Sequence, residues 1–497
     1  MPNDSKNEWT ITINPENGGF GGFVPSWFKN PWPVYGNKNQ ASDMKNIDIR
    51  DPNVLTQGGI ATNLTNGSET GAVTTLISSI LKTVTASDVS YATGSNKVYK
   101  ISSTAVTNDG TYPLTIDKSG VTGETATDLI DYKSNLYIFY NHSGSAGDIA
   151  QVNLTTNVID PDWGSTVPTG AATLQNAPHY TTLGYYGESE SIFFTNGQYI
   201  GRLTDTTLDP EAFPFSSNAQ TVSITWNENR VIVAVNRPNI TGSNFNQSAI
   251  YKWNGISAGW DGDPIEVPGR IGALYTKNGI TFVWWQDGNT TDGYWLGYIQ
   301  GAQLAFLRRY SGSLPNQTQV GEYEGFLMWI SSGKIYLWGA SDTSIATSLF
   351  YYATAKYTTN IGAIAAPFGS ILVASDNGTN YSLAKVAGYA TDSYYYTKVY
   401  TVSGAGFISE VDLIQIQTEQ MSSGARVDFT LYYNKAKSSQ ALDSTAYSTA
   451  NKTLHKILTK GIQVEDFRLD INFSNGSQTN PVKIRSIFIK GHYIPQI

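Results

Sequence analysis

The chain has 497 residues, a formal net charge of −8 and no cysteine. The lack of cysteine excludes a disulfide framework and a thiolate metal site, and the lack of a Lys/Arg cluster argues against binding nucleic acid by phosphate neutralisation. Apolar residues make up 40 % of the chain and charged residues only 14 %. With its many Gly, Asn, Thr, Ser and Tyr residues, this composition predicts an all-β protein of short strands joined by turns.

Residues 1–45 are predicted to form an extended N-terminal arm. Pro25, Pro31 and Pro33 exclude a helix there and favour extended backbone. Aromatic side chains are costly to leave in water, so those of the arm are candidates for contact with a neighbouring subunit. They are Phe20, Phe23, Trp27, Phe28, Trp32 and Tyr35. The alternative is an arm that folds over its own propeller, the domain predicted next along the chain.

Residues 46–87 are predicted to be a lead-in segment. They contain the alternating run NIDIRDPNVL and then a stretch rich in Gly, Thr and Asn. Within residues 72–84, AVTTLISSILKTV, the apolar residues have helical spacing, which predicts one short amphipathic helix. The β-branched residues of this stretch weigh against the helix.

A strand pair recurs seven times, never identically, between residues 88 and 388. Its second strand opens at Val98, Leu136, Ile192, Val231, Ile280, Phe326 and Ile371. These starts lie about 45 residues apart, as the blades of a propeller do. The repeat therefore predicts a β-propeller of about seven blades, although six or eight remain compatible with the spacing.

Residues 389–497 are predicted to form a separate antiparallel β-sandwich of jelly-roll type. Their strands are longer than those of the repeats, and runs such as VDLIQIQT and RVDFTLYY alternate apolar and polar residues. Such alternation is typical of strands that bury one face against a second sheet.

The sequence shows no recognisable set of catalytic, cofactor-binding or metal-binding residues. Its four histidines, at positions 142, 179, 455 and 492, stand in unrelated contexts. No HExxH pair, G-x-S-x-G elbow, P-loop or dinucleotide-binding glycine fingerprint is present. We therefore predict that the chain is not an enzyme and uses no cofactor.

Two alternatives depend on single loops. The segment GWDGDP places Asp261 and Asp263 close together, as a propeller glycosidase requires of its paired carboxylates. Trp260 and Trp295, in turns rich in Trp and Tyr, are candidate glycan contacts because an aromatic face can stack on a sugar ring. The structural alternative for the Asp residues is a hairpin turn. Trp284 and Trp285, two further candidates for sugar contact, are expected inside a strand, where alternation places one of them in the core.

Three features resemble the β-propeller tail proteins of tailed bacteriophages, in particular the nozzle or tubular tail proteins of short-tailed phages. They are the N-terminal SDMKNIDIRDPNVLTQGG, the run of divergent blades and the closing SNGSQTNPVKIRSIFIKGHYI. The resemblance implies a structural component of the virion tail, made in the host cytoplasm.

The same resemblance implies partners. We expect a homo-oligomer, a ring of six subunits, beside other tail or adaptor proteins and around a channel through which DNA passes without specific binding. The alternative is a receptor-binding or carbohydrate-binding tail protein that contacts a host surface glycan. No signal peptide and no apolar stretch of 18 residues occur in the sequence, so no membrane anchor is expected.

Overall fold

The computed structural model describes most of the chain. The described residues are 8–13, 20, 41–51, 53–64, 73–85, 88–143, 146–170, 174–205, 207–237, 247–286, 293–339, 348–402, 407–421, 425–434, 438–441, 454–474 and 481–495. They form two compact units. The propeller unit comprises residues 62–333 and 355–385, and the sandwich unit comprises residues 1–61, 334–354 and 386–497.

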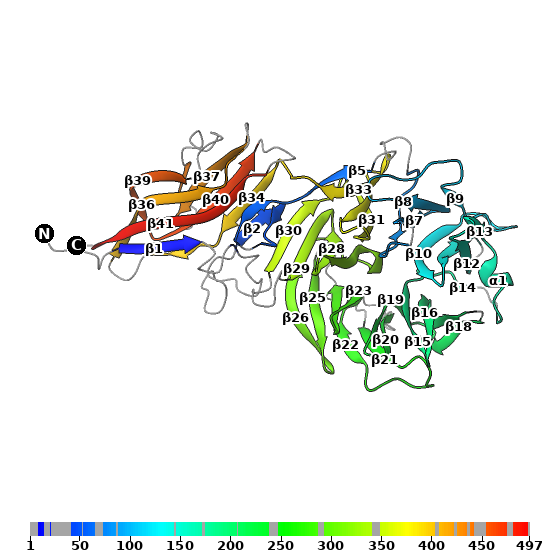
Figure 1. Ribbon diagram of the computed structural model, residues 1–497. Helices are drawn as coiled ribbons and strands as arrows, with labels where there is room; N and C mark the ends of the chain where they lie inside the picture. The colour runs from blue at the N-terminus through cyan, green and yellow to red at the C-terminus, as the bar shows by residue number, and fades with distance from the viewer. Residues whose placement is uncertain are drawn as a thin grey trace. The chain divides into compact units, whose positions relative to one another are not determined.

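Five sheets of consecutive antiparallel strands follow one another in the propeller unit (Figure 1). The first sheet contains β6 (Ser79–Ile80), β7 (Ser90–Gly94), β8 (Lys97–Ile101) and β9 (Leu114–Thr115). The second sheet contains β10 (Thr125–Tyr132), β11 (Asn135–His142), β12 (Ala146–Asn153) and β13 (Val158–Asp160), and β14 (Leu174–Gln175) pairs with β12. The third contains β15 (Thr181–Tyr186), β16 (Ser189–Asn196), β17 (Tyr199–Thr204) and β18 (Thr207–Pro214). The fourth contains β19 (Gln220–Asn227), β20 (Arg230–Arg237), β21 (Gln247–Trp253) and β22 (Ile265–Pro268), and the fifth β23 (Arg270–Lys277), β24 (Ile280–Gln286), β25 (Tyr294–Gln300) and β26 (Gln303–Tyr310).

Two further sets of strands bring the number in the described part of the chain to seven. The sixth set is β27 (Val320–Tyr323), β28 (Phe326–Ser331), β29 (Lys334–Gly339) and β30 (Ser348–Thr354), of which β29 and β30 belong to the sandwich unit. The seventh is β31 (Asn360–Ala365), β32 (Leu372–Asp376) and β33 (Tyr381–Ala387). A short helix, α1 (Trp163–Thr166), and a 3₁₀ turn, η2 (Gln317–Gln319), lie between strands. The predicted β-propeller is confirmed.

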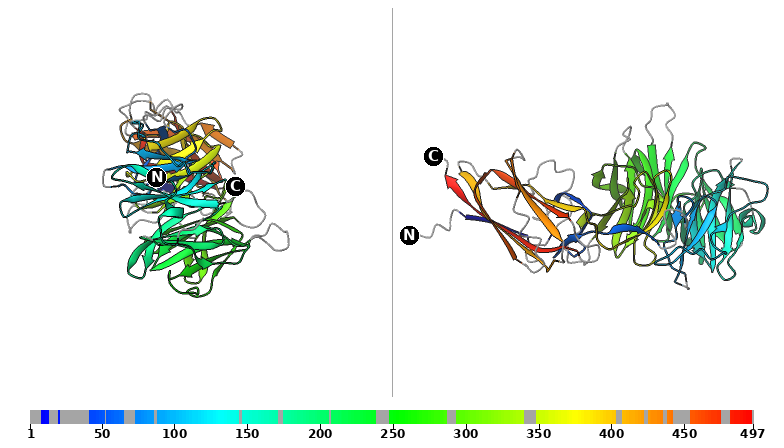
Figure 2. Two further views of the ribbon diagram at one scale, coloured as in Figure 1. Left: turned by 90° about the vertical axis from the view of Figure 1, so that its right-hand side faces the viewer. Right: turned by 90° about the horizontal axis from the view of Figure 1, so that it is seen from above.

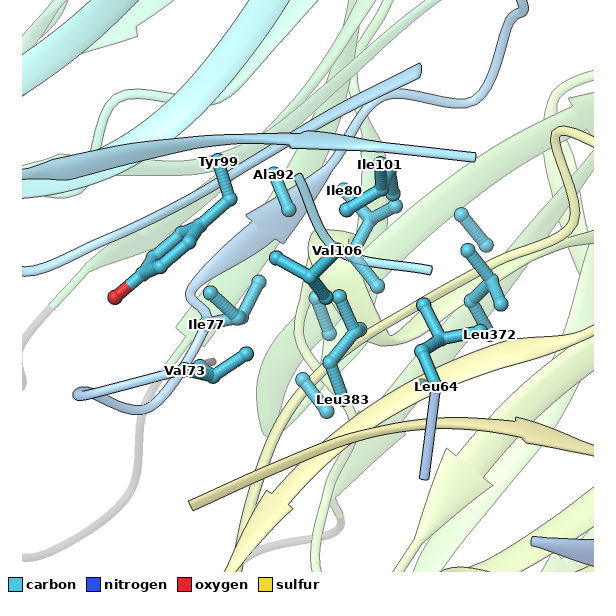
Figure 3. Close-up of a cluster of buried hydrophobic side chains, with 13 residues drawn as sticks. Leu64, Val73, Ile77, Ile80, Ala92, Tyr99, Ile101, Val106, Leu372 and Leu383 are labelled. Carbon is cyan, nitrogen blue, oxygen red and sulfur yellow. The ribbon is translucent and has the colours of Figure 1, made fainter. Parts of the chain in front are cut away.

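The last blade receives a strand from before the first. The end of β5 (Ile60–Asn63) runs beside β33, where Leu64 N–H donates to Leu383 O at 3.1 Å and Ser382 Oγ donates to Asn63 Oδ1 at 2.6 Å. An apolar cluster joins the first and last sets of strands, and Figure 3 shows Tyr99 and Ile101 on one side of it and Leu372 and Leu383 on the other. Hydrogen bonds and apolar packing therefore both close the ring.

The cores lie between successive blades rather than within one central layer. Val231, Val233 and Val235 of β20 pack in the cluster between the third and fourth blades, whereas Ile232 and Ala234 pack in the cluster between the fourth and fifth. A second strand is thus buried on both faces, which explains its continuous run of apolar residues.

The predicted helix within residues 72–84 is absent, and the described residues 73–84 contain only β6. Ile77 and Ile80 pack between the last and first blades, while Leu81 packs between the first and second. This segment packs against apolar residues on both sides. An extended strand points successive side chains to opposite sides, whereas an amphipathic helix presents its apolar residues on one face only. Because β6 precedes β7, Val98 falls on the third strand of its blade rather than the second.

The sandwich unit contains two antiparallel sheets. One has the order β3-β4-β41-β36-β39 with β1 beside β41, and the other has the order β2-β34-β40-β37-β38 with β35 beside β40. The bounds are β1 Glu8–Ile13, β2 Ala41–Lys45, β3 Ile47–Asp48, β4 Leu55–Gln57, β34 Ser393–Thr397, β35 Tyr400–Thr401, β36 Phe407–Thr418, β37 Arg426–Tyr433, β38 Ser438–Ala441, β39 Leu454–Val464, β40 Asp466–Ser474 and β41 Lys483–Pro495.

Strands from the first sixty residues complete this sandwich, although the predicted boundaries placed them in an arm and a lead-in. β1 pairs with β41 from Glu8 opposite His492 to Ile13 opposite Ile487, and Figures 1 and 2 show the blue strand beside the red one. Trp9 of β1 stacks on Phe467 of the other sheet at 5.7 Å. None of the described helices has the length and apolar character to cross a membrane.

Candidate functional site

A polar hollow of about 700 Å³ opens in the fourth blade. It is lined by Glu228, Asn229, Arg230, Asn254, Asp261 and Gly262, and we call it the blade-four hollow. Glu228 and Asn229 form the tight turn between β19 and β20 and both have positive φ, and Arg230 is the first residue of β20. Such two-residue turns match the twist of a hairpin, and Asn tolerates this backbone. The other three belong to the loop between β21 and β22.

Charge and hydrogen bonds hold the hollow in shape. Arg230 Nε donates to Asp261 Oδ2 at 2.8 Å, and this ion pair joins the turn to the loop. Asn254 Oδ1 accepts from the backbone N–H groups of Ile256 and Ser257, which fixes the beginning of the loop. The side chains of the hollow are therefore arranged before any ligand arrives.

Aromatic rings of the third and fourth blades lie near the hollow. Tyr185 is 49 % exposed and its ring centroid is 6.2 Å from that of Trp226, the residue two before Glu228. Trp226 lies over Gly184, where a Cβ would come within 2.2 Å of the indole, so only glycine permits this packing. We call Tyr185 and Trp226, with their neighbour Tyr186, the aromatic rim.

A single arginine connects the rim with the loop of the hollow. The Arg202 guanidinium lies 3.8 Å from the Tyr186 ring centroid, and its Nη1 donates to Gly255 O at 2.9 Å. Gly255 follows Asn254 directly, and the next residue, Ile256, is 59 % exposed. The rim and the hollow thus form one surface, in which flat apolar faces adjoin donors and acceptors.

The rings of the two tryptophans predicted to contact glycan pack mostly against other aromatic side chains of the protein. The Trp260 ring centroid lies 3.7 Å from that of Phe213, 4.8 Å from that of Phe215 and 4.5 Å from that of Tyr251. The Trp295 ring stacks on Trp285 with centroids 6.4 Å apart and meets Phe306 edge to face at 5.5 Å. Trp260 therefore supports the loop that carries Asp261, and Trp295 supports the outer strands of the fifth blade.

The remaining predicted residues are dispersed. Asp263 is exposed and lies outside the lining of the hollow. Phe20 is fully buried in its own chain and meets Tyr395 edge to face at 6.0 Å. The other five arm residues, Phe23, Trp27, Phe28, Trp32 and Tyr35, lie outside the described residues.

Sequence reasoning missed the rim and Arg230. The signal for Tyr185 was the pair of tyrosines just before the glycine of a hairpin turn in GYYGESE, where a strand leaves the core. No comparable signal marked Arg230, because its partner Asp261 is 31 residues away along the chain.

A possible metal-ligand group occurs in the sandwich unit, where Glu410, Asp412 and His492 bring ligand atoms within 4.8 Å of one another. His492 Nδ1 lies 2.9 Å from Asp412 Oδ2, and Glu410 Oε1 accepts from Gly461 N–H at 2.8 Å. Hydrogen bonds and an ion pair account for this geometry, so we base no metal site on it.

No family model matches the chain, and no curated protein sequence matches it. Among solved structures, a glycoside hydrolase family 43 arabinoxylan arabinofuranohydrolase from Bacillus subtilis is 11 % identical, with 86 % of this chain and 98 % of that chain covered and a TM-score of 0.29. An exo-β-1,3-galactanase from Phanerochaete chrysosporium is 9 % identical, with coverages of 76 % and 97 % and a TM-score of 0.26. The β-propeller domain of the Trilobed protease from Pyrococcus furiosus is 11 % identical, with coverages of 66 % and 94 % and a TM-score of 0.35.

These matches correct one prediction. The sequence predicted that the chain is not an enzyme, whereas the solved structures that resemble it include glycoside hydrolases, so that exclusion is wrong. At 9–11 % identity and TM-scores of 0.26–0.35 the likeness assigns no reaction. The propeller is evident from the chain's own sheets and from the packing between them.

Proposed function

We propose that this chain is a carbohydrate-binding component of a bacteriophage tail and that the blade-four hollow with its aromatic rim holds the sugar. The observation that carries this proposal is the half-exposed Tyr185, on a rim that Arg202 joins to the loop of Asp261, together with the fixed Arg230–Asp261 pair. An aromatic face covers the apolar C–H groups of a pyranose ring, while ionic and amide side chains bind its hydroxyls.

The structure of the hollow also suits binding in energetic terms. The side chains of Arg230 and Asp261 already hold one another, so a ligand loses little free energy in ordering them. Exposed apolar surface rimmed by polar groups is typical of interaction sites. The open form of the hollow favours a chain of sugars at a cell surface over a small enclosed ligand.

The phage setting of the proposal depends on the sequence resemblance to tail proteins. A carbohydrate-binding tail protein would recognise a polysaccharide of the host surface. Host and polysaccharide are to be identified by experiment, beginning with an array of bacterial surface glycans.

The test measures binding of the purified chain to that array and the affinity for each positive glycan. We expect Tyr185→Ala and Asp261→Asn each to weaken binding about tenfold or more, since one stacking face or one charged acceptor is lost. Phe306→Ala is the matched control, because Phe306 is an aromatic residue with 51 % exposure in the fifth blade. Unchanged affinity in both hollow variants, or equal loss in the control, would contradict the proposal.

The same glycans should be assayed for shortened products. The hollow contains two carboxylates, Glu228 and Asp261, and Glu228→Gln tests whether binding is accompanied by hydrolysis. Turnover that Glu228→Gln abolishes would extend the proposal from binding to cleavage.

A second candidate, a ring-forming structural component of the tail, is favoured by the same Phe306. This half-exposed side chain lies on β26, the last strand of the fifth blade, and meets Trp285 at 5.0 Å. An apolar residue held rigidly on an outer strand is a suitable subunit contact. Mass measurement of the native protein tests this candidate: a ring that Phe306→Asp dissociates supports it, and a monomer at all concentrations contradicts it.

A further inference from the structure

The propeller unit contains a second cavity, distinct from the blade-four hollow. Its volume is about 290 Å³, and it is lined by residues 79–83, 128–131, 181–183, 224–225, 274–275 and 317–318. These segments come from the first strands of five blades, or directly follow them, and from η2. The cavity therefore lies where the inner strands of the ring meet.

Lys82 is the cation of this cavity. Its side chain keeps exposed surface although protein surrounds it, since that surface faces the cavity. Among the described residues its ammonium forms neither an ion pair nor a hydrogen bond, and its one contact of note is the Tyr275 ring, whose centroid lies 5.1 Å from Nζ. Burial lowers the pKa of Lys82. An ammonium with unused N–H donors offers them to an acceptor that a ligand brings into the cavity.

The nearby carboxylate of Asp128 already accepts hydrogen bonds from other groups of the protein. Its Oδ1 accepts from Ser79 Oγ at 2.6 Å and from Leu129 N–H at 2.9 Å, and its Oδ2 accepts from the N–H and Oγ1 of Thr181, both at 2.8 Å. Four hydrogen bonds use the lone pairs of a carboxylate. Asp128 therefore balances the charge of Lys82 at a distance but leaves the donors of the ammonium unused.

The rest of the lining adds both kinds of hydrogen-bonding group. Asp131 accepts from Thr83 Oγ1 at 3.0 Å and is half-buried, which leaves it acceptor capacity on the cavity side. Thr182, Thr225 and Thr318 bring hydroxyl-bearing side chains to the lining, and Tyr275 brings a ring. Donors, acceptors and one aromatic face thus surround a small space.

We infer that this cavity binds a single neutral sugar unit, with Lys82 as the principal donor to its hydroxyls. Because Asp128 and Asp131 are the carboxylates of the cavity, a ligand with net negative charge would be repelled, whereas hydroxyls supply acceptors without charge. The volume of about 290 Å³ lies at the lower end of ligand pockets, roughly 300–1,000 Å³, and admits one ring rather than a chain. The inference is independent of the blade-four hollow.

The test titrates the full chain, carrying Tyr185→Ala and Asp261→Asn to disable the hollow, with a panel of neutral monosaccharides, inorganic phosphate and acetate. We expect one neutral sugar to bind at one site per chain, and phosphate and acetate not to bind. Lys82→Met should weaken that binding about tenfold or more, because a charged donor is removed. Lys385→Met is the matched control and should bind as the parent does, because this half-buried lysine of the seventh blade lies outside the lining of the cavity and donates to Ser103 O.

Thermal unfolding separates loss of binding from loss of structure. Lys82→Met removes an ammonium that lacks an acceptor, so this variant should unfold at the same temperature as the parent or higher. Weaker binding in a variant that is at least as stable supports the inference. Binding of phosphate in place of sugar, sugar binding that survives Lys82→Met, or no binding of any probe would overturn it.

Discussion

The pH dependence of stability should identify His179 as a group that is buried in its neutral form. His179 is fully buried, with Nδ1 2.9 Å from Thr195 O and Nε2 3.2 Å from Asn141 Oδ1. Neither partner carries a charge, so burial dominates and lowers the pKa of His179 from 6.5 to about 4. The folded protein therefore binds fewer protons here than the unfolded chain between these two pKa values.

The sign and size of the effect follow from that difference. Since the folded-state pKa is the lower one, the contribution of His179 to stability is complete above pH 6.5 and is lost progressively as the pH falls toward 4. A shift of this size corresponds to about 3 kcal/mol of unfolding free energy. The loss is confined to this pH window.

The assay is urea unfolding followed by tryptophan fluorescence between about pH 7.5 and pH 4, for the parent and His179→Gln. Carboxylates titrate alike in both, so the difference in unfolding free energy between parent and variant isolates one histidine. We expect the difference for His179→Gln to change by about 3 kcal/mol across the window. A difference for His179→Gln that stays flat within about 0.5 kcal/mol would refute the reasoning.

Two further substitutions test the packing of the blades. Asp128→Asn places an amide donor against the N–H of Thr181 and should lower the unfolding free energy by about 2–3 kcal/mol in urea; a loss below about 1 kcal/mol would contradict the hydrogen-bond assignment. Gly184→Ala brings a Cβ within 2.2 Å of the Trp226 ring and should cost about 1–3 kcal/mol, whereas Gly259→Ala, with open space around it, should be nearly neutral; equal losses in calorimetry would argue against this packing.

The repeat of strands was visible in the sequence because each second strand is buried on both faces. Val231 to Val235 are divided between two inter-blade clusters, so every residue of the run is apolar, and the same holds for Leu136 to Tyr140. Such runs are dense enough to count. The strand β6 has only two residues and produces no such apolar run in the sequence. The spacing of apolar residues around it therefore suggested a helix, although this segment is extended and packs on both sides.

The N-terminal strand shows a different limit of sequence reasoning. EWTITI alternates in the manner of a strand, but its partner β41 lies at the other end of the chain. Proline and glycine in the following residues suggested an arm, and nothing local could reveal a pairing across more than 470 residues. The partner of an edge strand depends on which other edge is left open, and this is known only once both sheets are assembled.

The sequence alone was sufficient for the all-β class and the propeller repeat, because these depend on local periodicity and composition. Only the tertiary structure placed Arg230 beside Asp261, put Tyr185 against Trp226, and brought Lys82 to the lining of a cavity without a hydrogen-bond partner among the described residues. These groupings join residues from different blades or different loops of one blade. Which of them meet is decided by the closure of the ring and the packing between blades, and no pattern within one repeat records either.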